Sequence, residues 1–141
     1  MDAILAVDPG REKCGLAVCT PSGVLARGIF RITEIENAVT QWVREYRVER
    51  IVLGDRTGSG EVQRRLQEAG VDVPVILVPE HATTLKARLR YFQDHPPRGW
   101  RRLLPLSLQT PPEPYDDYAA VVLAEEFFRK IPGGEEKFLG R

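Results

Sequence analysis

The sequence predicts a single α/β domain built on a five-stranded mixed sheet, a three-strand antiparallel meander plus two parallel strands, with helices on both faces. Three strand-like segments joined by short turns come first, and short turns connect only antiparallel neighbours. Helical segments then alternate with two more strand-like segments, which is typical of parallel strands linked by helical crossovers. The chain has 141 residues, a length that fits one domain with a sizeable core.

Segments rich in aliphatic and β-branched residues are the expected strands: 3–8, 13–20, 24–32, 50–54 and 73–78. The first is a continuous apolar run, which indicates a strand covered on both faces. Pro9-Gly10 ends this run, because proline cannot donate to a ladder and glycine adopts turn angles freely. Pro21-Ser22-Gly23 makes the next turn, so the first three strands form the meander.

Segments with helical patterning are the expected helices: 33–47, 60–69, 83–93 and 114–130. At the start of the first, Thr33 followed by Glu36 fits a capping box. A Pro- and Arg-rich connection covers 94–112. We expect one domain over residues 1–132, followed by a flexible tail over residues 133–141.

Composition and cysteine usage restrict the cellular setting. Lys plus Arg equals Asp plus Glu at 20 each, so the net charge indicates no partner. No apolar run reaches the roughly 18 residues that span a bilayer, and the stretch 3–7 is too short for a signal peptide. Cys14 and Cys19 lie at an odd spacing in one expected strand, so they point to opposite faces and cannot pair. We therefore expect a cytoplasmic protein with no membrane partner.

Acidic residues follow two of the expected strands. Asp8 closes the first strand, and Glu80 comes just after the last. Ligands of open α/β sheets bind beyond the carboxyl ends of the strands, so both acids lie where a site is expected. Taken singly, Asp8 is more simply a turn former, and Glu80 a carboxylate that favours a helix N-terminus.

A third acid, Asp116, lies in the first turn of the last helix, on a helical stripe with Ala119, Ala120, Leu123 and Phe127. This stripe faces inward and contains no basic residue. Inward carboxylates at Asp8, Glu80 and Asp116 would repel one another, and a divalent cation would neutralise them. An oxygen-only donor set favours Mg²⁺ or Mn²⁺ over Zn²⁺. Asp117 is the second choice as metal ligand, because periodicity alone does not exclude it.

Basic and aromatic residues gather in the second half of the chain. The expected nucleic-acid-binding residues are Lys86, Arg88, Arg90, Arg98, Trp100, Arg101 and Arg102. Basic side chains neutralise phosphates, and aromatic side chains stack on bases. The simpler interpretation is a solvated helix face with Tyr91 and Phe92 in the core.

The chain resembles the YqgF/RuvX family of RNase H-fold nucleases over about residues 3–128. Four segments in the family's order carry the resemblance: Ile4–Gly10 with Lys13–Val18, Val52–Gly54, Pro79–Thr84, and Asp116–Val121. That family includes proteins assigned as Holliday junction resolvases and nucleases that process the 5′ end of pre-16S ribosomal RNA.

The resemblance implies an RNase H-like fold and a Mg²⁺- or Mn²⁺-dependent nuclease acting on RNA or branched DNA. It implies that Asp8, Glu80 and Asp116 occupy the family's metal-binding catalytic positions. Pro79 stands where the family usually has Asp, and His81 where it has Arg. The alternative is therefore a catalytically weak or inactive relative that binds nucleic acid or protein. Monomer and dimer both stay open.

Overall fold

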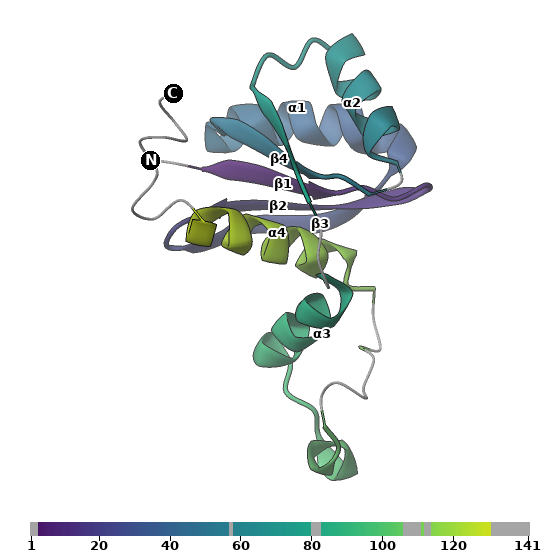
Figure 1. Cartoon of the computed structure of the whole chain (residues 1–141), viewed down its shortest axis with the longest axis vertical. Helices are drawn as coiled ribbons and strands as arrows, with labels where there is room; N and C mark the ends of the chain where they lie inside the picture. The colour runs from purple at the N-terminus through teal and green to yellow at the C-terminus, as the bar shows by residue number, and fades with distance from the viewer. Residues whose placement is uncertain (1–2, 57, 80–82, 106–110, 112–113, 131–141) are drawn as a thin grey trace.

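The computed structural model describes residues 3–56, 58–79, 83–105, 111 and 114–130 (Figure 1). Its centre is a five-stranded sheet in the order β3-β2-β1-β4-β5. The strands are β1 (Ile4–Asp8), β2 (Lys13–Thr20), β3 (Gly23–Arg31), β4 (Arg50–Gly54) and β5 (Val75–Val78). β1 runs antiparallel to β2 and parallel to β4, and β5 runs parallel to β4. The predicted mixed sheet is confirmed.

Helices cover both faces of the sheet, as predicted (Figure 1). The helical segments are η1 (Ile32–Glu34), α1 (Ile35–Tyr46), α2 (Ser59–Glu68), α3 (Thr83–Asp94), η2 (Gly99–Leu103) and α4 (Asp116–Lys130). α1 and α2 lie on one face, and α4 lies on the other with α3 packed against it. Among the described residues, no helix has both the length and the apolar content that crossing a bilayer requires.

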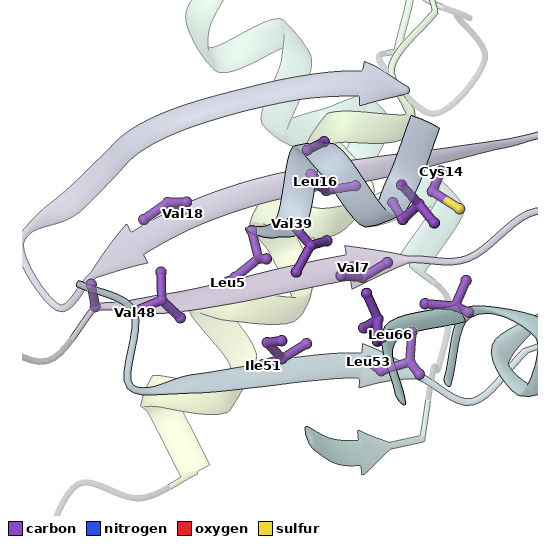
Figure 2. Packing of buried hydrophobic residues seen from close by; sticks show 14 residues of the cluster. Leu5, Val7, Cys14, Leu16, Val18, Val39, Val48, Ile51, Leu53 and Leu66 are labelled. Atoms are coloured by element: carbon purple, nitrogen blue, oxygen red, sulfur yellow. The ribbon is translucent and has the colours of Figure 1, made fainter. Parts of the chain in front are cut away.

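Alternation along the strands divides the interior into two cores. Leu5 and Val7 of β1 point to the α1–α2 side, where Figure 2 shows them packed with Cys14 and Leu16 of β2. The other face of the same strands, together with one side of α4, forms the second core. Cys19 lies in this second core, so the two thiols are on opposite faces and both are free, as predicted. Burial raises the pKa of the Cys19 thiol to about 12.

The start of α1 differs from the predicted capping box. Thr33 lies in η1, and the N-cap residue of α1 is Glu34, with no side-chain hydrogen bond capping the helix. Glu34 instead accepts a hydrogen bond from the backbone N–H of Arg31 at 3.2 Å. Glu36 forms an ion pair with Arg65 of α2 at 3.0 Å. Glu36, which was predicted to cap α1, therefore links α1 to α2.

Several other boundaries differ from the sequence prediction by one or two residues. β5 begins at Val75, because Pro74 has no N–H to donate, although its carbonyl accepts a hydrogen bond from Ile51 at 2.8 Å. The expected connection over 94–112 includes η2. The predicted tail over residues 133–141 lies outside the described residues.

Candidate active site

The site begins at the carboxyl end of β1, near the middle of the sheet. Asp8 is the last residue of β1 and lies opposite Gly15 of β2 in the antiparallel ladder. Its Oδ1 atom is buried. The apolar run before it fixes Asp8 in place, because Ile4 to Val7 are buried on both faces.

Gly15 brings the start of α4 against the same point of the sheet. A Cβ atom at Gly15 would lie 1.9 Å from the carbonyl oxygen of Asp116, so the contact requires glycine. Burial raises the pKa of the neighbouring Cys14 thiol, and the carboxylates of Asp8 and Asp116 raise it further. Both carboxylates therefore act on the same buried thiol.

The structure distinguishes the two adjacent acids of α4. The Asp116 side chain is 35% exposed, and its Oδ2 atom lies 3.7 Å from Nζ of Lys13, which is itself half-exposed. Asp117 is buried, and its Oδ2 atom accepts a hydrogen bond of 2.7 Å from Nη1 of Arg27 on β3. The prediction that Asp116 is the inward-facing acid is therefore wrong, because Asp117 is the buried one. The helical stripe itself contains no basic residue, but Lys13 of β2 lies beside Asp116 and Arg27 of β3 pairs with Asp117.

Arg27 also connects the start of α4 to the end of α3. Its guanidinium lies 4.3 Å from the centroid of the Tyr118 ring, a cation–π contact. The Tyr118 hydroxyl donates a hydrogen bond of 3.0 Å to Asp94. Burial and this hydrogen bond raise the pKa of Tyr118 to about 12. Burial opposes ionisation of Asp94, but the hydrogen bonds from Tyr118 and Arg90 outweigh it and lower the pKa of that carboxyl. The first turn of α4 is thus tied to two other elements.

The third predicted acid, Glu80, lies outside the described residues, as does His81. Val78, two residues earlier, pairs with Gly54 at the carboxyl edge of β4 and β5. In the described part of the chain, no three acidic, histidine or cysteine side chains form a metal-binding group. The described part of the candidate site is therefore Asp8 and Asp116, with Lys13 beside them.

Comparison with known proteins identifies the family. A family model described as RuvX, Holliday junction resolvase, matches residues 2–130. The chain belongs to the RuvX family. The family's description and the names of its relatives indicate a nuclease, and the resemblance seen in the sequence is confirmed.

Curated RuvX relatives are similar to this chain at modest identity. A candidate pre-16S rRNA nuclease of Listeria monocytogenes serovar 1/2a is 27% identical, over 88% of this chain and 95% of the relative. One of Dictyoglomus thermophilum is 30% identical, over 72% of this chain and 84% of the relative. One of Gloeobacter violaceus is 29% identical, over 60% of this chain and only 64% of the relative.

A solved structure is similar to the fold of this RuvX-family chain. Thermus thermophilus RuvC, in complex with a Holliday junction substrate, matches with a TM-score of 0.60 and 15% identity. The match covers 93% of this chain and 96% of that protein. At this identity the likeness concerns the fold, and it confirms the RNase H-like architecture.

The predicted nucleic-acid-binding residues fall into two groups. The first group lies on α3. Lys86 pairs with Glu126 of α4, Arg88 donates to the hydroxyl of Tyr115 just before α4, and Arg90 pairs with Glu125 of α4 and Asp94 of α3. Tyr91 and Phe92 are buried, in agreement with the simpler interpretation. Arg98 and Arg102 are exposed beyond α3, and the side chains of Trp100 and Arg101 lie outside the described part of the structure.

The sequence analysis assigned no role to Lys13, Gly15 or Arg27, although the first two lie in the segment Lys13–Val18 that resembles the family. Lys13 and Gly15 follow the expected turn after Asp8 by a few residues, so their nearness to Asp8 was foreseeable. The role of Arg27 could not be predicted from the sequence, because its hydrogen-bond partner Asp117 is 90 residues away along the chain.

Proposed function

We propose that this chain is a metal-dependent nuclease that hydrolyses phosphodiester bonds in structured nucleic acid. The proposed metal-binding catalytic residues are Asp8, Glu80 and Asp116. The observation that carries the proposal is the approach of the Asp116 backbone to Gly15, directly beside Asp8. Membership of the RuvX family supports the same assignment.

The donor set suits Mg²⁺ or Mn²⁺. Asp8 and Asp116 offer carboxylate oxygens, which hard divalent cations prefer. Asp117 is less suited, because its carboxylate is buried against Arg27. When bound, divalent cations lower the pKa of a water molecule and neutralise charge that develops on the phosphate. We assign this task to Asp8, Glu80 and Asp116 as the residues that would hold the ions.

Lys13 has a separate role in this proposal. Its ammonium is about half-exposed and lies 3.7 Å from Oδ2 of Asp116, a loose contact that a bound cation would replace. We assign to this ammonium the binding of a non-bridging oxygen of the scissile phosphate, a contact that would help to orient the phosphate in the site. Lys13→Ala is expected to raise KM more than it lowers kcat, because the contact forms already in the ground state.

We propose two candidate substrates, a precursor of 16S ribosomal RNA and a four-way DNA junction, because the names of a relative and of the family refer to them. The residues proposed to grip the nucleic acid are Lys86, Arg88, Arg90, Arg98, Trp100, Arg101 and Arg102. Arg98 and Arg102 are exposed, and so is Lys86, but Lys86 is paired with Glu126. The ion pairs of Lys86 and Arg90 with α4 must rearrange before these two side chains can bind phosphate.

A cleavage panel tests the proposal. The full chain is incubated with a four-way DNA junction, a precursor-rRNA 5′ segment and matched single strands, each with Mg²⁺, Mn²⁺ or EDTA. We expect cleavage with either metal, none with EDTA, and loss of cleavage in Glu80→Gln. Binding of a substrate without metal-dependent cleavage would instead identify the inactive relative.

A further inference from the structure

A tip formed by residues 98–104 projects from the molecule beyond α3. In Figure 1 the green η2 segment lies at the lower end of the longest axis, apart from the sheet. Leu103, the last residue of η2, is 84% exposed, and the adjacent Leu104 is 39% exposed. The other large exposed hydrophobic side chains described, Leu25 and Leu77, lie singly on the two edge strands. Folding of the described domain does not bury the Leu103–Leu104 pair.

The charge around the tip favours a polyanionic partner. No Asp or Glu occurs between Asp94 and Glu113, whereas Arg98, Arg101 and Arg102 occur in that stretch. Arg98 and Arg102 are exposed, and Nε of Arg102, the residue before Leu103, donates to the Gly99 carbonyl at 3.2 Å. The tip therefore combines leucine side chains with guanidinium groups.

We propose that Leu103 and Leu104 form a wedge that inserts into nucleic acid where the base stack is interrupted. Leucine is among the side chains that proteins insert between base steps, and arginines hold the flanking phosphates in such contacts. Unstacking is cheapest where a base is unpaired, so the preferred targets are branch points, bulges and duplex–single-strand boundaries. This inference rests on the proposed function and specifies the part of the substrate that the chain selects.

A second copy of the chain fits this tip less well. Two tips facing each other would bring six arginines together without an acidic residue of either tip between them. The Leu103–Leu104 pair is also a small patch compared with a stable protein–protein interface. Nucleic acid satisfies both the apolar and the basic side chains.

The test uses 2-aminopurine fluorescence in EDTA, so that binding is measured without cleavage. The full chain is titrated with a four-way DNA junction and with an RNA duplex carrying a 5′ overhang, each labelled at the interruption. Continuous DNA and RNA duplexes serve as reference ligands. The variants are the double replacement Leu103→Ser with Leu104→Ser, and Leu25→Ser as the matched control, since Leu25 is 49% exposed on β3.

We expect the unchanged chain and Leu25→Ser to raise the fluorescence at the interruption, and the double variant not to. The double variant should also bind interrupted ligands about 10-fold more weakly, a loss comparable to one stacking contact. Its affinity for continuous duplexes should stay the same. The ligand, DNA or RNA, that shows the larger leucine-dependent rise is the one that the wedge unstacks more strongly.

A double variant that keeps the fluorescence rise would overturn the wedge, as would light scattering showing that the substitutions change the oligomeric state. The cleavage panel separates this outcome from failure of the proposed function. A chain that shows the leucine-dependent rise but no metal-dependent cleavage keeps the wedge and loses the nuclease assignment. A chain that cleaves with metal but shows the same fluorescence rise without the two leucines keeps the nuclease assignment and loses the wedge.

Discussion

At the carboxyl end of β1, Asp8 and Asp116 belong to elements packed tightly enough that a single Cβ atom at Gly15 would collide with Asp116. At η2, by contrast, Arg98 and every described side chain from Arg102 to Pro105 are exposed. The same chain therefore packs the elements that carry Asp8 and Asp116 tightly together, and it exposes the arginines Arg98 and Arg102. Substitutions at the first region should change activity, stability or both, whereas substitutions at the second should change binding alone.

The largest expected effect separates the two adjacent acids of α4. Asp116→Asn removes a proposed metal ligand, so cleavage should fall by roughly 10³-fold, since metal ions supply several kcal/mol of transition-state stabilisation. Asp117→Asn should keep measurable cleavage but lower the free energy of unfolding by about 1 kcal/mol. This modest loss is expected because Arg27 is 38% exposed and water screens the pair. Kinetics and urea unfolding of both variants check the prediction, and the reverse pattern would make Asp117 the ligand.

The next effect concerns the close approach of α4 to the sheet. Gly15→Ala should lower the free energy of unfolding by roughly 1–3 kcal/mol, the usual cost of forcing atoms into a packed interior. Cleavage should fall too, because the shift moves Asp116 away from Asp8. Gly60→Ala in α2 is the matched control, since a Cβ there meets nothing within 4 Å. Equal stability of the two variants would show that α4 accommodates the methyl group easily.

The fold was largely predictable, because it depends on local patterns. The apolar run before Asp8 and the turn after it fixed the first strand, and the change of period fixed α1. The site was only partly predictable. Periodicity placed Asp116 and Asp117 on neighbouring stripes, but Arg27, which separates their roles, approaches only in the folded chain.

The count of charges along the sequence overestimated the free positive charge of α3 for a similar reason. The segment around α3 has a single local acid, Asp94, yet the fold brings Glu125 and Glu126 of α4 against Arg90 and Lys86. Side-chain neutralisation between helices is invisible in a local count. Beyond α3, Arg98 and Arg102 are exposed, so there the charge count along the sequence describes the surface better.

A smaller effect is expected at the tip. Replacing Arg98, Arg101 and Arg102 by Ala should weaken nucleic-acid binding and reduce its salt dependence by roughly 0.7–0.9 in the log–log slope for each lost phosphate contact. The melting temperature and metal response should stay unchanged. Affinity measured at several salt concentrations checks this, and an unchanged slope would remove the tip from the nucleic-acid interface.

The smallest effect is a pH dependence at the junction of α3 and α4. Because hydrogen bonds lower the pKa of Asp94 in the folded chain, its contribution to stability is present above the ordinary value of 3.8 and is lost as the pH falls through the lowered value. Asp94→Asn should therefore flatten the acid limb of stability against pH. Thermal melts from pH 5 downward check this, and an unchanged acid limb would show that other carboxylates dominate it.

The most direct test of the central claim is the thermal shift produced by Mn²⁺. If Asp8 and Asp116 hold the ion in the folded chain, Mn²⁺ at 100 times its Kd should stabilise the unchanged protein by about 2.7 kcal/mol. That stabilisation raises the melting temperature by several degrees. Asp8→Asn should lose most of this rise, and Asp117→Asn should keep it even though its own melting temperature is lower. A full Mn²⁺ response in Asp8→Asn would contradict the account, because the ion would then bind elsewhere.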